Sequence, residues 1–270
     1  MKPTSAPPLW DSSPGVLTVA DNELHVWRAS LRGGADVLER YEATLAPEEK
    51  KRAARFLVPQ AKEDFIAARG ILRELLGRYL GGSAPGIRLS YGAQGKPALF
   101  QPLPLRFNVS HSHGLAAFVF ARGMEVGIDI EKIRQDFAAE QVASLYFAEQ
   151  EIAELRGLPG ESRAAGFFKC WTLKEAYLKA RGQGLQIPLS SFQVTVTNDE
   201  PQELIDEAGS RWSLYGFEPS PEFTGAVAGG GQGWKLRYWE WRESQAEPQR
   251  GTSVRSAASS QDRDCLCALS

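Results

Sequence analysis

A short alternating run, VGIDIE at residues 126–131, constrains the fold more than any other segment. Strand side chains point alternately to the two faces of a sheet, so the three aliphatic residues share one face while Gly127, Asp129 and Glu131 share the other. Two carboxylates therefore lie together. Acids on a strand usually face solvent, but Gly127 leaves room for another group to approach the backbone. The run is interpreted either as an exposed strand face or as half of a binding site.

A second informative run, FKCWTLKEAYLK at residues 168–179, has helical periodicity. Trp171, Glu175 and Lys179 are spaced four apart, which places an aromatic ring, an acid and a base on one side of a helix. The same spacing is typical of a surface ion pair, which contributes about 0.3–0.5 kcal/mol. With the two strand acids, Glu175 would instead complete the set of oxygen ligands that Mg²⁺ prefers.

Polar donors crowd the end of a further predicted strand, FNVSHSHG at residues 107–114. Asn108, Ser110 and His111 offer an amide, a hydroxyl and an imidazole, and the imidazole can carry charge near neutral pH. A polar turn with capping hydroxyls also explains such a cluster. The alternative is a group of donors that contacts an anion.

Two basic features could supply positive charge to the same anion. Lys96 lies in the loop GAQGKP, where glycines let the backbone come close and the lysine supplies a point charge. A basic run at residues 50–55, which includes Arg55, is typical of a solvated helix face unless it points inward. The formal net charge of −2 argues against binding to a long nucleic-acid duplex, while local phosphate sites stay open.

The chain has 270 residues, 43% of them hydrophobic, which is enough for one large domain or two small ones. Only three cysteines are present, so a disulfide framework is not expected and a reducing compartment is indicated. The first residues lack the apolar core of a signal peptide, and no stretch approaches the roughly 20 apolar residues that span a bilayer. The sequence therefore predicts a cytoplasmic protein with no membrane partner.

Hydrophobic periodicity divides the chain into two halves of similar outline. For the first half it predicts a hairpin within residues 16–29, helices at 47–56 and 61–80, and strands at 87–91, 98–100, 107–109 and 115–121. For the second half it predicts the acidic strand, helices at 137–146, 149–155 and 163–180, and strands at 192–197, 212–216, 224–228 and 234–241. The expected organisation is a flexible segment 1–15, an N-terminal subdomain 16–123, a C-terminal subdomain 124–242 and a disordered tail 243–270.

The motifs FNVSHSHG, VGIDIE and WTLKEAYLKARGQGL, in this order and at these separations, resemble the three signature regions of the Sfp-type 4′-phosphopantetheinyl transferases. The upstream segments EEKKRAARF, FIAARGILRELLGRYL and YGAQGKPAL also resemble that family, so the similarity covers residues 24–241. The W-x-x-K-E-A pattern at residues 171–176 resembles a subgroup associated with fatty-acid, polyketide or related carrier proteins. The tail beyond Glu243 has no recognisable counterpart.

The resemblance implies an α+β fold of two pseudo-twofold-related halves, with coenzyme A bound in the cleft between them. It implies an enzyme that transfers the 4′-phosphopantetheine group of coenzyme A to a serine of an acyl or peptidyl carrier protein and releases 3′,5′-ADP. The protein is expected to be a monomer. Two other functions stay open: a non-catalytic protein that binds coenzyme A or the carrier, and a Mg²⁺-dependent pyrophosphate hydrolase.

The resemblance also implies roles for the candidate site residues. The ligands of Mg²⁺, held together with the coenzyme A pyrophosphate, would be Asp129, Glu131 and Glu175. The contacts to coenzyme A would come from Arg55, Lys96, Asn108, Ser110, His111 and Lys179, with Asn108 mainly orienting its strand end. The catalytic set would be Glu175, Lys179 and Asp129. In that set Lys179 neutralises the leaving group, and Glu175 takes the proton of the carrier serine, directly or through a metal-bound water.

Overall fold

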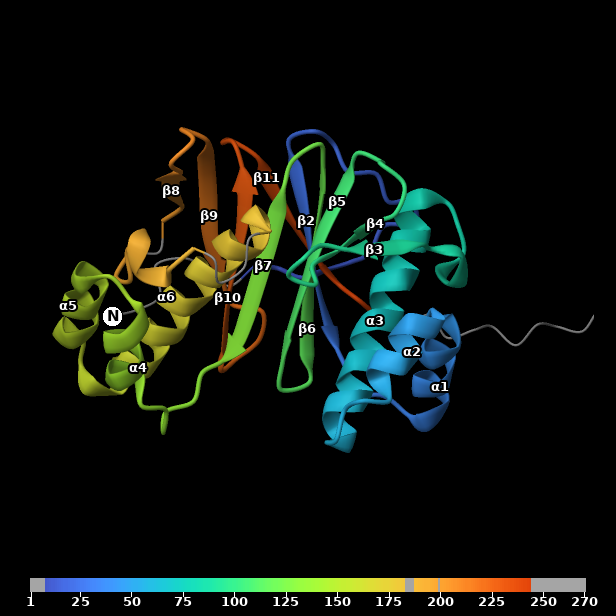
Figure 1. Cartoon of the computed structure of the whole chain (residues 1–270), viewed down its shortest axis with the longest axis horizontal. Coiled ribbons are helices and arrows are strands. Elements are labelled where there is room, and N and C mark those ends of the chain that lie inside the picture. The colour runs from blue at the N-terminus through green and yellow to red at the C-terminus, as the bar shows by residue number, and fades with distance from the viewer. Residues whose placement is uncertain (1–7, 183–186, 199, 244–270) are drawn as a thin grey trace, which may run out of the picture.

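The computed structural model describes residues 8–182, 187–198 and 200–243, and two α+β halves lie side by side in it (Figure 1). A five-stranded sheet, in the order β1-β11-β2-β6-β5, belongs mainly to the first half. A four-stranded sheet, in the order β7-β10-β9-β8, belongs to the second, and β3 pairs with β4 separately. Helices lie at both ends of the molecule with the two large sheets between them (Figure 1). The predicted α+β class is confirmed.

The bounds of the elements follow the chain order. The first half contains β1 (Asp11–Ser12), β2 (Glu23–Ser30), α1 (Ala35–Thr44), α2 (Pro47–Ala53), α3 (Pro59–Leu80), β3 (Leu89–Tyr91), β4 (Pro97–Leu99), β5 (Leu105–Ser112) and β6 (Leu115–Arg122). The second half contains β7 (Val126–Lys132), α4 (Ala139–Tyr146), α5 (Glu149–Gly157), α6 (Gly160–Arg181), β8 (Gln202–Ile205), β9 (Arg211–Phe217) and β10 (Phe223–Gly230). The last strand is β11 (Lys235–Glu240).

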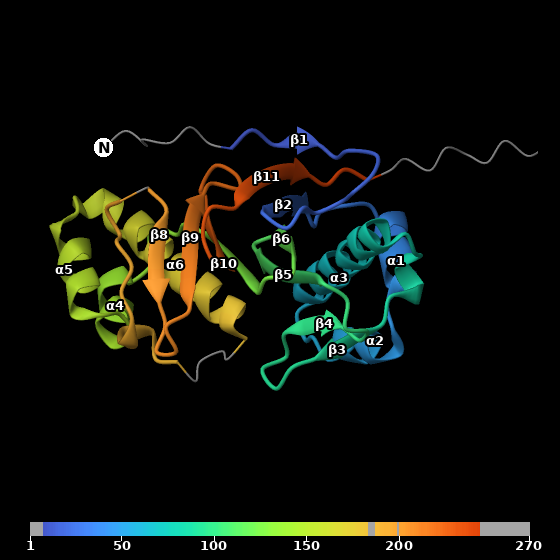
Figure 2. The same ribbon diagram turned by 90° about the horizontal axis from the view of Figure 1, so that it is seen from above.

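Two long helices, α3 and α6, carry the cores of the two halves. Each ends at a glycine in the left-handed region, Gly81 with φ of 66° and Gly182 with φ of 68°, a conformation that glycine adopts without strain. Each helix packs its apolar side onto the sheet of its own half. Seen from above, α6 lies against β9 and β10 at one end and α3 lies beside β5 at the other (Figure 2). Among the described residues, no helix combines the length and apolar character needed to cross a membrane.

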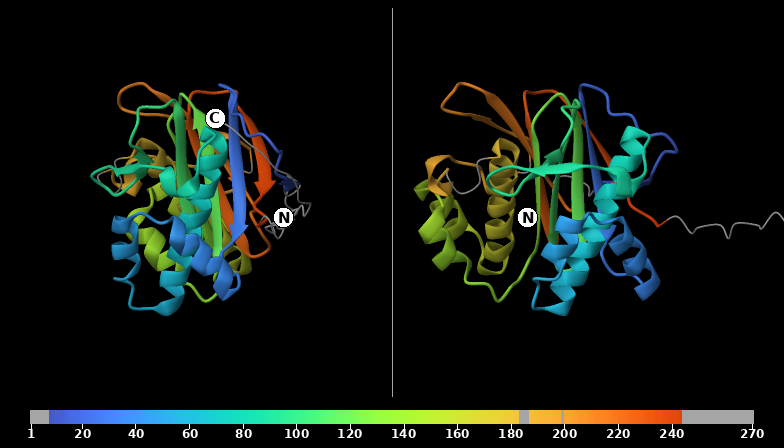
Figure 3. Two further views of the ribbon diagram at one scale, coloured as in Figure 1. Left: turned by 90° about the vertical axis from the view of Figure 1, so that its right-hand side faces the viewer. Right: turned by 45° about the vertical axis from the view of Figure 1, so that its right-hand side comes forward.

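A third core cluster joins the two halves. It packs the aliphatic face of β7, with Val126, Ile128 and Ile130, against Val26 of β2 and Val119 of β6. The aliphatic face predicted for the acidic strand is therefore buried. As a result β5, at the edge of the first sheet, and β7, at the edge of the second, lie side by side (Figures 1 and 3).

One prediction for the first half is wrong, and one helix of that half was not predicted. The described residues before β2 form no hairpin with it: Leu17 and Val19 are buried in the first core without belonging to a strand. The neighbours of β2 are β6 and β11 instead. Helix α1 is an unpredicted element, and it contributes Val37, Leu38 and Tyr41 to the same core.

The ends of the chain depart from the expected subdomain limits. Strand β11, assigned by the sequence to the second subdomain, pairs in parallel with β2 and so extends the sheet of the first half. Strand β1 pairs in parallel with β11, so Asp11 and Ser12, predicted to be flexible, belong to a sheet. The predicted disorder of the tail 243–270 concerns residues that lie, apart from Glu243, outside the described part of the chain.

The predicted strand at residues 192–197 is also wrong, and β8 lies at that edge of the second sheet instead. The amide of Val194 donates to the carboxylate of Glu151 at 2.8 Å, and the amide of Val196 donates to that of Glu154 at 2.9 Å. Both acids lie on α5. Amides that already bind side chains are not available to a neighbouring strand. The segment 192–197 is therefore attached to α5 and does not pair into the second sheet.

Candidate active site

Side chains of β5 bridge the seam between the two sheets. Alternate side chains of β5 accept hydrogen bonds from alternate backbone amides of β7. The three contacts are Asn108 Oδ1 with the Ile128 amide at 2.9 Å, Ser110 Oγ with the Ile130 amide at 3.4 Å, and Ser112 Oγ with the Lys132 amide at 3.3 Å. The polar cluster predicted at the strand end therefore satisfies the edge of the acidic strand.

Gly127 brings α6 directly onto β7. A Cβ atom at this position would lie 2.1 Å from the Ala176 carbonyl oxygen and 2.3 Å from the Ala180 amide nitrogen. Any other residue would push the helix away, because both contacts are with backbone atoms. The group that uses the space beside Gly127 is thus α6 itself, and its approach carries Glu175 and Lys179 over the acidic face of the strand.

Lys179 pairs with the strand acid Asp129. Its ammonium nitrogen lies 2.6 Å from Asp129 Oδ1 and 3.1 Å from Ser110 Oγ, and the Ser110 hydroxyl donates to the same Oδ1 at 2.8 Å. Asp129 is only 3% exposed. The alternative of a simple surface ion pair along the helix is therefore wrong for Lys179, because its partner comes from β7.

Three carboxylates near the seam carry negative charge that one lysine does not balance. Burial, followed by the charge of Asp129, raises the pKa of both Glu131 and Glu175. Within the described residues, Asp129 Oδ2 is a buried oxygen without a hydrogen-bond partner. A buried carboxylate oxygen with no donor suits a cation, since unpaired buried acceptors are costly.

These residues fit a hard divalent cation by donor type. All three offer oxygen ligands, which suits Mg²⁺ rather than a soft metal. In the described part of the chain, however, no three acidic, histidine or cysteine side chains are already gathered around one point. The fit is therefore one of chemistry and of the orphaned Asp129 oxygen, and the side chain of Glu175 would turn toward the ion when it binds.

A cavity of about 290 Å³ opens in front of this seam. The second half contributes Glu175 and Lys179 to its wall, and the first half contributes Asn108 and His111 from β5. Asp129 lies beneath Lys179. Desolvation, together with the nearby cations, lowers the pKa of His111, so its imidazole is less readily charged than in water.

The arginines in the wall of the cavity only partly match the sequence expectation, because Arg52 belongs to the predicted basic run whereas Arg69 was not selected. Arg52 and Arg69 line it, whereas Arg55, the predicted contact, is exposed on the turn after α2 and does not belong to this wall. Arg69 is 7% exposed, and its Nη1 has no hydrogen-bond partner among the described residues. A cation on the apolar side of α3, next to the buried Phe65, is the signal that could have found it.

Lys96 joins the two halves at one end of the cavity. Its ammonium donates to the Val126 carbonyl at 3.1 Å, to the Ala180 carbonyl at 3.3 Å and to the Glu125 carboxylate at 3.5 Å. Burial lowers its pKa. It lines the cavity as the sequence suggests, but its donors are directed to protein acceptors in this structure.

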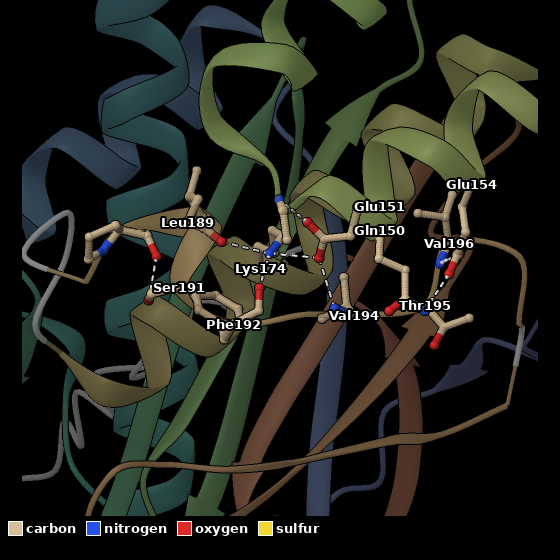
Figure 4. A network of polar contacts seen from close by, with 12 residues as sticks. Gln150, Glu151, Glu154, Lys174, Leu189, Ser191, Phe192, Val194, Thr195 and Val196 are labelled. Carbon is tan, nitrogen blue, oxygen red and sulfur yellow. Dashed lines mark hydrogen bonds and ion pairs between the residues drawn. The ribbon is translucent and has the colours of Figure 1, made fainter.

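A buried ion pair fixes the opposite side of α6 (Figure 4). Lys174 and Glu151 are both fully buried, with 2.7 Å between Nζ and Oε1. The lysine also donates to the carbonyls of Leu189 and Phe192, at 2.7 and 2.6 Å. Because Lys174 precedes Glu175, this anchor sets the rotation of the helix and thereby the direction of the site residues.

Comparisons with known proteins identify the family of the chain. A family model described as the 4′-phosphopantetheinyl transferase superfamily matches residues 125–228, which include β7 and α6. The chain is 37% identical to the 4′-phosphopantetheinyl transferase HetI of Nostoc sp. over 86% of its own length and 98% of that protein. It is 26% identical to the 4′-phosphopantetheinyl transferase Sfp of Bacillus subtilis, over 70% of this chain and 84% of the other.

A third relative matches a shorter region. The 4′-phosphopantetheinyl transferase AcpT of Salmonella typhimurium is 40% identical over 47% of this chain and 65% of its own. Members of this family use coenzyme A as a substrate and act on carrier proteins. The similarity to HetI spans nearly the whole of that protein, so the chain belongs to the 4′-phosphopantetheinyl transferase superfamily and is a transferase of this type.

Proposed function

We propose that the cavity between the halves binds coenzyme A and that Mg²⁺-dependent transfer to a carrier serine takes place beside Asp129. The observation that carries this proposal is the unpartnered, buried Oδ2 of Asp129 next to the Lys179 ammonium. One carboxylate oxygen is held by a cation of the protein, and the other is left for a cation that arrives with the substrate. Pyrophosphate and a divalent ion complement this pair by charge.

The phosphate groups of coenzyme A would be held by cations of both halves. Lys179 from α6 would face the pyrophosphate, and Arg69 and Arg52 would meet a further phosphate at the other side of the cavity. The unpartnered Nη1 of Arg69 supports this, because a buried guanidinium N–H needs an acceptor. His111 would donate a hydrogen bond from the same wall. Arg55, being exposed, is the weakest of the expected contacts.

Asp129, Glu131 and Glu175 would hold Mg²⁺, which when bound would withdraw charge from the pyrophosphate oxygens. In the reaction, the carrier serine oxygen forms a bond to the β-phosphorus, the bond from that phosphorus to the bridging oxygen breaks, and 3′,5′-ADP leaves with the electron pair. Lys179 neutralises the departing oxygen. Glu175 takes the serine proton, a role supported by its place in the cavity wall beside Lys179.

The carrier protein would approach the part of the second half around α4. In the region 133–158, Leu145 is 76% exposed and Tyr146 is 49% exposed, whereas Phe147 is only 4% exposed. Phe147 is therefore a core residue, and the exposed pair before it is the better candidate for a contact with the carrier. We propose that the chain acts as a cytoplasmic monomer.

The test is a reaction of the full chain with an apo acyl carrier protein and an apo peptidyl carrier domain, each with coenzyme A and Mg²⁺ or with EDTA. Intact mass should rise by about 340 Da, the mass of phosphopantetheine, only when Mg²⁺ is present. Transfer that persists in EDTA would contradict the metal requirement. Cleavage of coenzyme A without a change in carrier mass would indicate the hydrolase, and binding without either reaction would indicate the non-catalytic alternative.

A further inference from the structure

The seam between the halves repeats one hydrogen-bonding unit twice, two residues apart. In each unit a serine hydroxyl of β5 accepts the amide of one β7 residue and donates its single proton to the carboxylate of the residue before it. In the first unit, Ser110 Oγ accepts from Ile130 at 3.4 Å and donates to Asp129 at 2.8 Å. This unit also includes Lys179 and so belongs to the site already described.

The second unit has no assigned role. Ser112 Oγ accepts the Lys132 amide at 3.3 Å and donates to Glu131 Oε2 at 2.8 Å. The hydroxyl is also 3.0 Å from Nδ1 of His113, which can donate to it. Ser112 is 8% exposed, and the described residues that β5 contributes to the cavity wall are Asn108, Val109 and His111. Ser112 is therefore absent from that wall, and its hydroxyl contacts the candidate metal ligand Glu131.

We propose that Ser112 is a positioning residue that holds the Glu131 carboxylate in the orientation a divalent cation requires. This inference rests on the proposed metal site. A glutamate rotates about three side-chain bonds, and each must be ordered before the carboxylate can serve as a ligand. Ser112 limits this freedom, since its hydroxyl is held in turn by the β7 backbone. Hydrogen bonds to metal-binding carboxylates of this kind strengthen the ligand they orient.

The two hydrogen bonds of the Ser112 hydroxyl explain why a serine suits position 112. The hydroxyl must be an acceptor toward the Lys132 amide and a donor toward Glu131 at the same time, which alanine cannot do and threonine can. Cysteine keeps the side-chain shape but forms weak hydrogen bonds. Ser213 offers a matched control, because it is a buried strand serine, 3% exposed, whose hydroxyl donates to the Gly231 carbonyl at 2.8 Å in the other sheet region.

The experiment measures binding of Mn²⁺ alone to the full chain, from the paramagnetic resonance signal of the free ion. The variants are Ser112→Ala, Ser112→Cys, Ser112→Thr, Glu131→Gln and Ser213→Ala. We expect Ser112→Ala and Ser112→Cys to weaken Mn²⁺ binding about tenfold, the cost typical of losing an outer hydrogen bond to a ligand. Ser112→Thr and Ser213→Ala should bind as the wild type does, and Glu131→Gln should bind at least as weakly as Ser112→Ala.

The outcomes separate the inference from the proposed function. If Glu131→Gln weakens binding but Ser112→Ala and Ser112→Cys do not, the metal site stands and the role of Ser112 is overturned. If Ser112→Thr is as weak as Ser112→Ala, the hydroxyl is not the cause, which also overturns it. If the wild type does not bind Mn²⁺, or Glu131→Gln binds normally, the proposed metal site fails and the inference fails with it. Thermal unfolding of each variant shows whether a loss of binding reflects a loss of folding.

Discussion

Lys179 of α6 and Asp129 of β7 form an ion pair whose acid is buried and whose lysine is partly exposed, with 2.6 Å between Nζ and Oδ1. The pair leaves the other Asp129 oxygen without a donor among the described residues. It therefore gives the seam both signs of charge: an ammonium that can face an anion and a carboxylate that can face a cation.

Replacing Lys179 by methionine should weaken coenzyme A binding about tenfold to a hundredfold, because a hydrogen bond to a charged group contributes roughly 1.5–3 kcal/mol. Isothermal titration with coenzyme A measures this. The control is Lys235→Met, because Lys235 is exposed on β11 and is not among the residues that line the cavity. Equal affinity of the Lys179 variant and the control would argue against contact with the pyrophosphate.

Replacing Glu175 by glutamine should leave coenzyme A bound but lower the turnover number about 100-fold to 10,000-fold, the usual contribution of a general base. The amide keeps the size of the side chain but cannot take the serine proton. Glu161→Gln, an exposed change at the start of the same helix, is the control. Turnover measured with an apo carrier protein decides the matter, and an unchanged rate would remove Glu175 from the reaction.

Gly127→Ala should displace α6 from β7, because the new Cβ would lie 2.1 Å from the Ala176 carbonyl oxygen. We expect a loss of at least about 3 kcal/mol in the free energy of unfolding, the upper range for overpacking, together with a loss of activity. At Gly157, by contrast, an added Cβ meets no described atom within 4 Å, so Gly157→Ala should change stability by less than about 1 kcal/mol. Urea unfolding followed by circular dichroism compares the two.

Lys174→Met should lower the free energy of unfolding by about 3–5 kcal/mol, because it leaves the fully buried Glu151 carboxylate without its counter-charge. The exposed pair between Arg242, 72% exposed, and Glu240 provides the comparison. Arg242→Met should cost less than about 1 kcal/mol, as is usual for surface ion pairs. Similar costs for the two variants in urea unfolding would show that the buried pair does not anchor α6.

The stability of the protein should fall on acidification because of His25. Burial lowers the pKa of this histidine from 6.5 to about 4, partly opposed by Glu23. The unfolded chain therefore binds a proton near pH 6.5 that the folded protein accepts only near pH 4, so between these values stability decreases as pH falls, by about 3 kcal/mol in total.

The matched variant for this effect is His25→Gln, which keeps an acceptor for the Tyr79 hydroxyl, now 2.8 Å from Nδ1. Its free energy of unfolding should fall less than that of the wild type between pH 7 and pH 4. Urea unfolding at several pH values measures both curves. Parallel curves would mean that His25 does not contribute to the acid sensitivity.

Comparison of the predicted and observed elements shows where sequence patterns failed. The two long helices and the acidic strand lie within a few residues of their expected limits. The segment 192–197 has the composition of a strand, but its amides bind acids of α5 that are distant in the sequence. Sequence patterns also failed to separate Arg55 from Arg69. Periodicity alone did not distinguish the exposed arginine from the one that lines the cavity.

Local repeats in the sequence are enough to place Asp129 and Glu131 on one strand face, and Glu175 and Lys179 on one helix side. The meeting of these two faces and the pairing of Lys179 with Asp129 follow from the folded structure. The reason is that such contacts depend on the close packing of α6 on Gly127 and on the side chains that join β5 to β7. The helix packing and the hydrogen bonds each link segments that are far apart in the sequence, so no local sequence pattern predicts them.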